Sequence, residues 1–248
     1  MRFEYLYSSL CQKNTNDMNA TYTYDYPRPA VTTDCVIFGY NGKDLNILLI
    51  ERGIEPFKGK WALPGGFVQM DESTEEGALR ELEEETGVKN VYIEQLYTFS
   101  EVERDPRGRV ISVAYFALVK STDYSVVGGD DAKSVKWFPI REIPSLAFDH
   151  DMILRVAHQR LKAKIRYQPI GFELLDEEFT IPELQSLYEA VLDVQFDRRN
   201  FNRKIMSLEI LVSLDKKDAG VAHRAARYFK FDNQKYEELT KRGFNFEI

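Results

Sequence analysis

A glutamate-rich stretch between Gly66 and Val88 contains the residues whose types and spacing best suit chemistry. Glu81, Glu84 and Glu85 are three and four positions apart, and side chains at that spacing share one face of an α-helix. Carboxylates crowded on one face repel one another, and a hard cation, Mg²⁺ or Mn²⁺, would relieve that repulsion through oxygen ligands. The pattern therefore predicts a metal-binding helix, with a solvated acidic helix face as the alternative.

The helix that would present these carboxylates has clear limits in the sequence. Helical periodicity runs over residues 74–86 and stops at Gly87, since glycine readily adopts the left-handed backbone that ends many helices. Ser73 and Glu76 predict a capping box at its start. The apolar residues that would anchor the helix to a sheet are Ala78, Leu79 and Leu82. We therefore expect the carboxylates to be held on a packed helix rather than on a loop.

Two glycines precede this helix, Gly65 and Gly66. Without side chains, they let the backbone approach a neighbouring group closely. The carbonyl group of Gly65 is therefore a further candidate ligand for the predicted metal ion.

The stretch resembles the Nudix box of the Nudix hydrolase family. It matches G-x5-E-x7-R-E-U-x-E-E-x-G-U, in which U is a bulky aliphatic residue, at every fixed position. The matching residues are Gly66, Glu72, Arg80, Glu81, Leu82, Glu84, Glu85, Gly87 and Val88. The resemblance implies an α/β Nudix fold, with a mixed sheet sandwiched by helices. It also implies hydrolysis of a diphosphate linked to another moiety.

The resemblance implies catalytic roles for residues of the box. Glu84 and Glu85 are the implied main metal ligands, and Glu81 is a further ligand or the general base. Arg80 is expected to pair with Glu72 or with a box glutamate. A further carboxylate usually comes from a downstream loop, where the candidates are Glu101, Glu103, Asp105, Asp130 and Asp131. The intact box keeps hydrolysis open for this chain.

Charge is unevenly distributed along the 248 residues, whose formal net charge is −7. Residues 197–230 contain nine Lys and Arg against four Asp and Glu, so this stretch has a net charge of +5 and the rest of the chain −12. A basic island in an acidic protein indicates a local anion-binding surface, such as one for nucleic acid. A solvated basic face or a dimer contact is the alternative.

The basic island falls within the pattern of a winged helix-turn-helix. Thr180 and Glu183 predict a capping box before a helix with an apolar stripe, and Asp197 predicts the cap of a second helix after a short break. The expected buried stripe of that second helix is Phe201, Ile205, Leu208 and Val212. Residues 213–223 predict a hairpin and residues 228–231 a strand. Helix, turn, helix and two-stranded wing is the order of a winged DNA-binding domain.

Arginine and asparagine side chains of the second helix are suited to reading DNA, since they pair bidentately with guanine and adenine edges. The candidates on this helix are Arg198, Arg199, Asn200, Asn202, Arg203 and Lys204. Candidates for phosphate or minor-groove contacts in or near the wing are Lys216, Lys217, His223, Arg224 and Arg227.

A wider resemblance covers about residues 28–231. Segments such as 28–31, 56–67, 104–109 and 197–204 resemble the Nudix-related transcriptional regulators, which fuse a Nudix-like sensor to a winged helix. The resemblance implies a small-molecule effector, either ADP-ribose or a pentose such as arabinose. Because one winged helix reads few base pairs, we also expect a homodimer on double-stranded operator DNA. An active pyrophosphohydrolase acting on a substrate such as ADP-ribose is the alternative.

Five residues are candidates for contacts with the effector: Arg52, Phe57, Trp61, Arg104 and His150. Guanidinium groups bind phosphates, and aromatic rings stack on a base or a sugar. For His150, capping of the next helix is an equally good interpretation, and Trp61 at a strand start suits a core position.

Shifts in composition place the boundaries. We expect a disordered or mis-assigned extension over residues 1–27, a Nudix-like domain over 28–166, a connector over 167–179 and the winged helix over 180–240. Cys11 and Cys35 are the only cysteines and form no CxxC, which argues against a disulfide framework and a structural zinc. The apolar runs are too short to span a bilayer. We therefore expect a cytoplasmic protein that does not enter a membrane.

Overall fold

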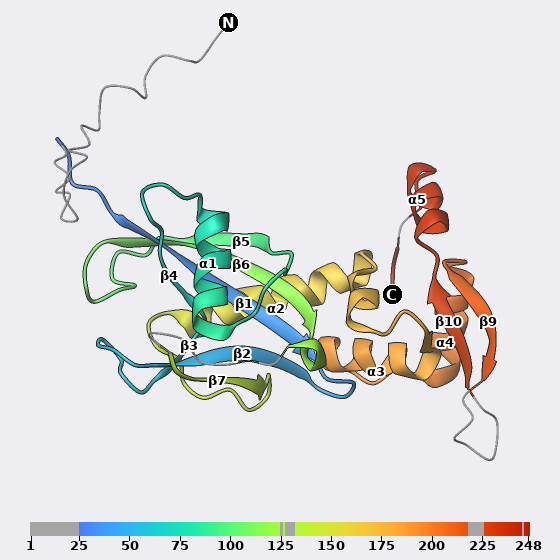
Figure 1. Ribbon diagram of the computed structural model, residues 1–248. Coiled ribbons are helices and arrows are strands. Elements are labelled where there is room, and N and C mark those ends of the chain that lie inside the picture. The colour runs from blue at the N-terminus through green and yellow to red at the C-terminus, as the bar shows by residue number, and fades with distance from the viewer. Residues whose placement is uncertain (1–24, 125, 127–131, 218–225, 245) are drawn as a thin grey trace, which may run out of the picture.

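The computed structural model describes residues 25–124, 126, 132–217, 226–244 and 246–248. Its elements fall into two groups (Figure 1). The elements up to residue 167 build a sheet with a helix on each face, and those from residue 179 onward build a smaller unit at the opposite end. In the part that the structure describes, no helix is long and apolar enough to cross a membrane.

The large sheet has seven strands and mixed direction. Its strands are β1 (Ala30–Tyr40), β2 (Leu45–Arg52), β3 (Trp61–Ala62), β4 (Gly65–Phe67), β5 (Glu94–Phe99), β6 (Val110–Lys120) and β7 (Ala132–Pro139). The main path runs β3-β2-β1-β6-β5, while β4 pairs with β1 and β7 with β2. Strands β1 and β6 are parallel from Ala30↔Val110 to Tyr40↔Lys120, and the other pairs are antiparallel. The predicted mixed α/β sheet is therefore confirmed.

Strand β1 is buried on both faces, which explains its nearly continuous apolar sequence. Alternate residues point to opposite sides of a strand. Cys35 and Ile37 belong to a core on the side of α1 (Thr74–Thr86), whereas Val36 and Phe38 belong to the core on the side of α2 (His150–Tyr167). The sheet is thus sandwiched between two helices (Figure 1).

Helix α1 has the predicted limits. Ser73 accepts a hydrogen bond from the backbone of Glu76, whose side chain accepts one from the backbone of Ser73, so the capping box is complete. Gly87 ends the helix with φ 74°. Ala78 and Leu82 are fully buried, and they hold the glutamate-rich face of the helix in a fixed position against the sheet.

The smaller unit is a winged helix. It consists of α3 (Ile181–Leu192), α4 (Arg198–Ser207) and a three-stranded sheet of β8 (Phe179–Thr180), β10 (Arg227–Phe231) and β9 (Leu211–Lys217). Thr180 and Glu183 form the predicted capping box of α3, and Asp197 caps α4. The predicted hairpin tip, including Gly220, His223 and Arg224, lies outside the described residues.

One expectation for this unit was wrong, and one helix was not anticipated. Val212 does not continue the buried stripe of α4, because the helix ends at Ser207 and Val212 lies on β9 with 45% of its surface exposed. A further helix, α5 (Asn233–Lys241), follows the wing, and no periodicity had indicated it. The expected connector also contains a short 3-10 helix over Ile170–Leu174, whose Gly171 and Leu174 are buried.

One apolar core joins the two units. The cluster on the α2 side of the sheet contains Phe38 of β1 and Leu161 of α2, and it continues through Leu187 and Tyr188 of α3 to Phe229 of β10. The backbone N–H of Ile248 donates to the carbonyl of Arg166 at the end of α2 over 3.1 Å, an ordinary hydrogen-bond distance. The winged helix is therefore packed onto the sheet rather than tethered by a loop.

Candidate functional site

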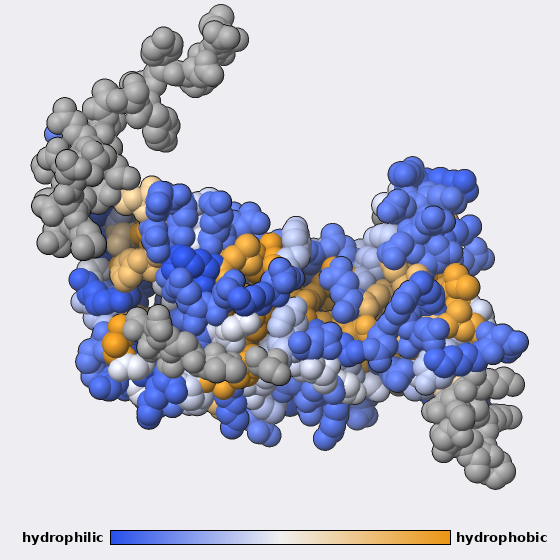
Figure 2. Space-filling model, in the orientation of Figure 1, coloured by the Kyte–Doolittle hydropathy of each residue, from blue (hydrophilic) through white to orange (hydrophobic). Residues whose placement is uncertain are grey.

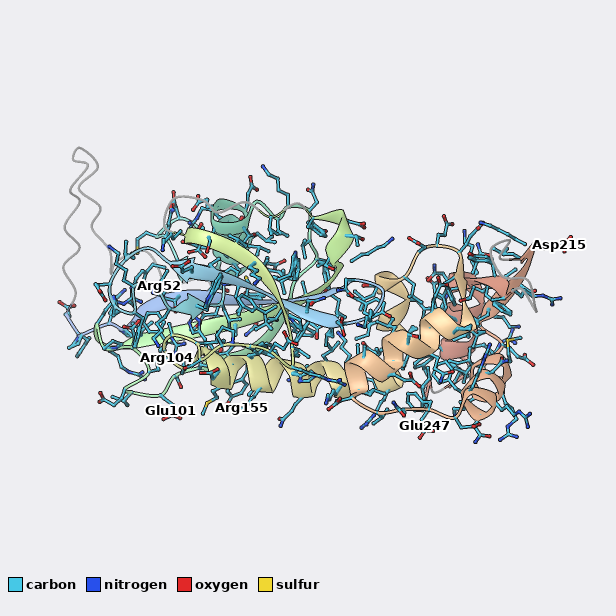
Figure 3. The ribbon with its side chains drawn as sticks, turned by 90° about the horizontal axis from the view of Figure 1, so that it is seen from below. Arg52, Glu101, Arg104, Arg155, Asp215 and Glu247 are labelled. Carbon is cyan, nitrogen blue, oxygen red and sulfur yellow. The ribbon has the colours of Figure 1, made fainter. Side chains whose placement is uncertain are left out.

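A cavity of about 240 Å³ opens beside α1 and the start of α2. Its walls come from β1, β2, β4, α1, the loop after β5 and the turn before α2. The lining residues are Thr32, Asp34, Ile50, Arg52, Ile54, Leu63, Gly65, Gly66, Phe67, Glu81, Glu85, Arg104, Asp105, Arg107, Phe148 and His150. In Figure 3, Arg52 and Arg104 lie together at the sheet end of the molecule, far from Asp215 of the wing. The cavity therefore belongs to the large unit alone.

A buried ionic network forms one side of the cavity. Arg104 is 4% exposed at its side chain and donates twice to Asp149, over 3.0 Å from Nε and 2.7 Å from Nη2. Its Nη2 also lies 3.4 Å from Asp34 Oδ2, which accepts a hydrogen bond from Ser112. Two acidic side chains thus neutralise one buried guanidinium and orient it.

His150 completes this network. Its Nδ1 accepts a hydrogen bond from the backbone N–H of Leu63 over 2.9 Å, and its Nε2 lies 3.3 Å from Asp34 Oδ1. Burial lowers the pKa of His150, against the opposing charges of Asp34 and Asp149. The ring is therefore neutral, since an Nδ1 that accepts a hydrogen bond carries no proton.

Guanidinium groups and aromatic rings alternate on the opposite wall. The Cζ atoms of Arg52 and Arg107 lie 4.9 and 5.2 Å from the centre of the Phe148 ring, and Arg107 also lies 4.8 Å from the Phe67 ring. Phe57 meets Phe148 edge to face, with ring centres 4.8 Å apart. Such a wall offers positive charge and flat surfaces to one ligand.

The third wall is acidic and is shaped by glycines. Glu85 Oε2 accepts a hydrogen bond from the backbone N–H of Gly65 over 2.8 Å. A Cβ on Gly65 would lie 2.0 Å from the carbonyl oxygen of Thr33, and one on Gly66 would lie 2.5 Å from the carboxylate of Glu81. Only glycine fits at position 65, where the obstacle is backbone and φ is 151°, whereas a side chain at position 66 would displace the carboxylate of Glu81. Burial raises the pKa of Glu81 although Arg80 opposes the shift.

Arg80 donates hydrogen bonds to three carboxylates of the box. It bonds Glu72 through Nε and Nη2, over 2.9 and 2.7 Å, and its Nη1 bonds Glu81 over 2.8 Å and Glu84 over 3.0 Å. The hydrogen bonds from Arg80 are the largest cause that lowers the pKa of Glu72 to about 2. The pairing expected of Arg80 is present with all three partners.

The box carboxylates, as arranged, do not fit the expected metal site. Among the described residues, no group of three or more His, Cys, Asp or Glu side chains is placed to hold a metal ion. Glu81 and Glu84 both accept hydrogen bonds from Arg80 and Glu85 accepts one from Gly65. The guanidinium of Arg80 thus offsets the repulsion between carboxylates that we had expected a metal ion to offset. Asp130 and Asp131 lie outside the described residues.

The structure places three of the five candidates for effector contacts in the cavity lining. Arg52, Arg104 and His150 line the cavity, whereas Phe57 and Trp61 do not. Phe57 supports the ring of Phe148 from outside, and Trp61 packs edge to face on Phe138 with ring centres 4.7 Å apart. Of the four residues expected around a metal ion, Gly65, Glu81 and Glu85 line the cavity, and Glu84 does not.

A second candidate site lies on α4, at the far end of the molecule. Phe201 and Ile205 bury one face of the helix. The residues expected to face solvent are all exposed, namely Arg198, Arg199, Asn200, Asn202, Arg203 and Lys204. Arg203 donates to the side chain of Asn200 over 2.7 Å. The exposed helix thus presents a basic and amide surface. Figure 2 shows mainly hydrophilic residues over α5, which belongs to the same unit.

The wing flanks this helix with further cations. Lys216 of β9 pairs with Glu178 and also lies 4.8 Å from the centre of the Tyr228 ring. Arg227 is exposed at the start of β10 and reaches the hydroxyl of Ser213 over 3.4 Å. Of the other wing candidates, His223 and Arg224 lie outside the described residues.

Comparisons with known proteins cover both units. Residues 28–159 match the NUDIX domain, and residues 171–231 match the NrtR DNA-binding winged helix domain. The ADPR responsive transcriptional repressor NtrR of Acinetobacter baylyi is 36% identical over 218 residues, which are 86% of this chain and 86% of that protein.

The chain belongs to the NrtR family of Nudix-related regulators.

Two further proteins resemble this NrtR-family chain. Shewanella oneidensis NrtR, in a crystal structure with a 27mer DNA, has a TM-score of 0.69 and 33% identity, covering 87% of this chain and 97% of that one. The ADP-ribose pyrophosphatase of Methanocaldococcus jannaschii is 44% identical over 130 residues, 52% of this chain and 73% of that protein. The predicted fold and family are thus confirmed.

Sequence reasoning missed two residues that line this NrtR-family cavity, Asp34 and Phe148, and one that lies next to it, Asp149. Asp34 lies within the apolar run of β1, and a lone carboxylate in a strand buried on both faces was a usable signal. Phe148 and Asp149 carried no comparable signal. They reach Arg52, Arg107 and Arg104 only because the chain turns at Phe148, with φ 54°, just before α2.

Proposed function

We propose that this NrtR-family chain is a transcriptional repressor that binds operator DNA through α4 and the wing and binds ADP-ribose in the cavity. The observation that carries the proposal is a solvent-facing basic helix of a winged helix, packed through one apolar core onto a sheet with an arginine-walled cavity. A ligand in the cavity can therefore act on the DNA-binding surface through packed structure.

The cavity suits a nucleoside diphosphate sugar better than a free pentose. Arg52, Arg104 and Arg107 bring three guanidinium groups to the cavity for two phosphates, and two of them would exchange a carboxylate partner for a phosphate, Asp149 at Arg104 and Asp105 at Arg107. Phe148 and Phe67 supply flat surfaces. A pentose has no charge to pair with these groups. The names of the Acinetobacter baylyi repressor and the Methanocaldococcus jannaschii pyrophosphatase also point to ADP-ribose, and neither points to arabinose.

A homodimer in the cytoplasm is part of this proposal. One recognition helix reads few base pairs, so winged helices commonly act as dimers on two half-sites. Operator DNA also has to be accessible to the protein. Sedimentation of the protein alone and with operator DNA tests the dimer, for which one dimer per palindromic site is expected.

DNA binding in the absence of ligand tests the first half of the proposal. We expect Arg199→Ala combined with Arg203→Ala to weaken binding to the upstream DNA of its own gene by roughly tenfold or more, because both side chains face solvent on α4. The matched control, Lys241→Ala with Arg242→Ala, removes two exposed charges from the end of α5. Equal losses in both double variants, measured by gel shift, would contradict a specific role for α4.

Release by ligand tests the second half. ADP-ribose at saturating concentration is expected to dissociate the complex, while arabinose and xylose leave it intact. A thermal shift with the same three compounds reports binding without DNA. Binding of a pentose but not of ADP-ribose would overturn the assignment of the effector.

Pyrophosphohydrolase activity is a second candidate function. All nine fixed positions of the box are present, and Glu81 and Glu85 line the cavity. Nudix hydrolases generally use divalent metal ions, and we propose Mg²⁺ or Mn²⁺ for this activity, although the arrangement described above does not assemble their site. Formation of AMP and ribose 5-phosphate from ADP-ribose with Mg²⁺ decides: turnover that Glu84→Gln abolishes supports hydrolysis, and no turnover would mean that the domain acts as a sensor only.

A further inference from the structure

The residue that begins helix α2 does not cap it. Asp149 occupies the N-cap position, where an aspartate usually accepts a hydrogen bond from the backbone N–H of the second or third helical residue. Its carboxylate makes no such bond. Both of its oxygens instead accept hydrogen bonds from Arg104, over 2.7 and 3.0 Å. The first turn of α2 therefore lacks a side-chain cap because a guanidinium occupies the carboxylate.

The backbone at this point is also held away from an ordinary helix start. Asp149 has φ −97° and ψ 19°, whereas N-cap residues are typically extended. Phe148 before it has φ 54°, a left-handed conformation that is unfavourable for a phenylalanine. A rotation of the backbone at these two residues would therefore bring Asp149 into the conformation of a residue that caps α2.

Arg104 is in contact with both the ligand cavity and the start of the helix. It lines the cavity, whereas Asp149 does not. A diphosphate in the cavity and the carboxylate of Asp149 are therefore competing anions for one guanidinium. The exchange is inexpensive in free energy, because Arg104 remains buried and paired with an anion before and after it.

Helix α2 leads from this point to the winged helix. It runs from His150 to Tyr167, and Leu161 and Ile165 lie in the core that continues into α3. At its other end, the carbonyl of Arg166 accepts the hydrogen bond from Ile248. A change in the first turn of α2 is thus transmitted through packed side chains to the unit that contains α4.

We propose that Arg104 exchanges partners on ligand binding. Without ligand it holds the carboxylate of Asp149 and leaves α2 uncapped; with the diphosphate of ADP-ribose bound, Arg104 turns to the phosphates and Asp149 caps the first turn. Asp149 is a positioning residue, and the re-formed first turn shifts α2 and the attached winged helix. This inference rests on the proposed function, since it explains how an occupied cavity weakens DNA binding.

The variant Asp149→Asn separates the two roles of the carboxylate, because asparagine caps a helix well but does not neutralise a guanidinium. It should imitate the ligand-bound form. We expect ADP-ribose to bind roughly tenfold more tightly by calorimetry, and operator DNA without ligand to bind more weakly by a similar factor. A merely structural defect would weaken both. The matched control is Asp25→Asn, an exposed aspartate of the same unit, which should leave both affinities unchanged.

A second variant, Asp149→Ala, neither holds Arg104 nor caps α2. It should bind ADP-ribose more tightly than wild type, yet ADP-ribose should no longer change its affinity for DNA. Thermal unfolding checks that both variants are folded, and ADP-ribose should raise their midpoints by more than it raises that of the wild type.

Three results would overturn the exchange of partners: weaker ADP-ribose binding by folded Asp149→Asn, wild-type affinities in both variants, or normal release of DNA by ADP-ribose in Asp149→Ala. These results leave the proposed function standing as long as ADP-ribose releases wild-type protein from DNA. Failure of that release in wild type overturns the proposed function and this inference together.

Discussion

Identical residue types behave differently in this protein because their surroundings differ. Arg80 holds the pKa of Glu72 at about 2, chiefly through hydrogen bonds, while burial raises the pKa of Glu81, which Arg80 also bonds. The neutral His150 accepts the N–H of Leu63 only while it remains unprotonated. Chemistry at the cavity thus depends on which side chains are paired and which are buried.

His150 makes stability depend on pH. Burial lowers its pKa below the ordinary value of 6.5, so the folded chain binds fewer protons than the unfolded chain as pH falls through 6.5. The free energy of unfolding must therefore fall with pH in that window and below, down to the folded pKa. Asparagine can accept the same N–H without titrating. We expect His150→Asn to lose less stability than wild type between about pH 7 and pH 5.5, near the ordinary histidine range.

Urea unfolding at several pH values measures this difference. Parallel losses in wild type and His150→Asn would show that the ring does not contribute to the pH dependence.

Element ends are defined by short local patterns in this chain. The capping boxes at Ser73 and Thr180 and the left-handed Gly87 were all expected from sequence and all occur. Helix α2 differs, since its N-cap Asp149 is engaged by Arg104, a residue of a distant loop. A helix start that depends on a tertiary contact is the element best suited to respond to a ligand.

Removal of the cap of α3 tests how much such an end contributes. Thr180 Oγ1 accepts a hydrogen bond from the backbone of Glu183 and donates one to its side chain over 2.9 Å. We expect Thr180→Ala to lower the free energy of unfolding by about 1 kcal/mol, while Thr180→Ser retains most of it. Chemical denaturation of the three proteins checks the order. An alanine variant as stable as the serine variant would contradict a role for the cap.

At the scale of the whole molecule, two units that are separate in sequence share one core. Phe38 under α2 and Leu187 in α3 belong to the same buried cluster, and Leu187 is fully buried. The unit with the cavity and the winged helix are thus connected by close-packed side chains, which can adopt few intermediate arrangements. A flexible linker would not transmit a small change at α2.

This packing predicts that a change in the winged helix is detected in the sheet unit. Leu187→Ala should cost about 2–5 kcal/mol and lower the midpoint of thermal unfolding followed by tryptophan fluorescence. The chain has two tryptophans, Trp61 and Trp137, and both lie in the large sheet. Exposed Val212→Ala on β9 is the control and should have little effect. An unchanged tryptophan transition in Leu187→Ala would mean that the units unfold independently.

The sequence alone determined what depends on neighbours along the chain. Period-3.6 helices, their caps and the spacing of the box are local patterns, and together with the family resemblance that they carry they were sufficient for the mixed sheet, the winged helix and the family. The exposed face of α4 followed in the same way, because Phe201 and Ile205 define the opposite face.

Only the tertiary structure decided what depends on residues far apart in sequence. Arg80 bonds Glu72, Glu81 and Glu84 together, whereas the sequence left open which of these carboxylates it would meet. The contacts of Arg104 with Asp34 and Asp149 join segments 70 and 45 residues apart. A local sequence pattern cannot predict such pairs, because only the folded chain brings them within hydrogen-bonding distance.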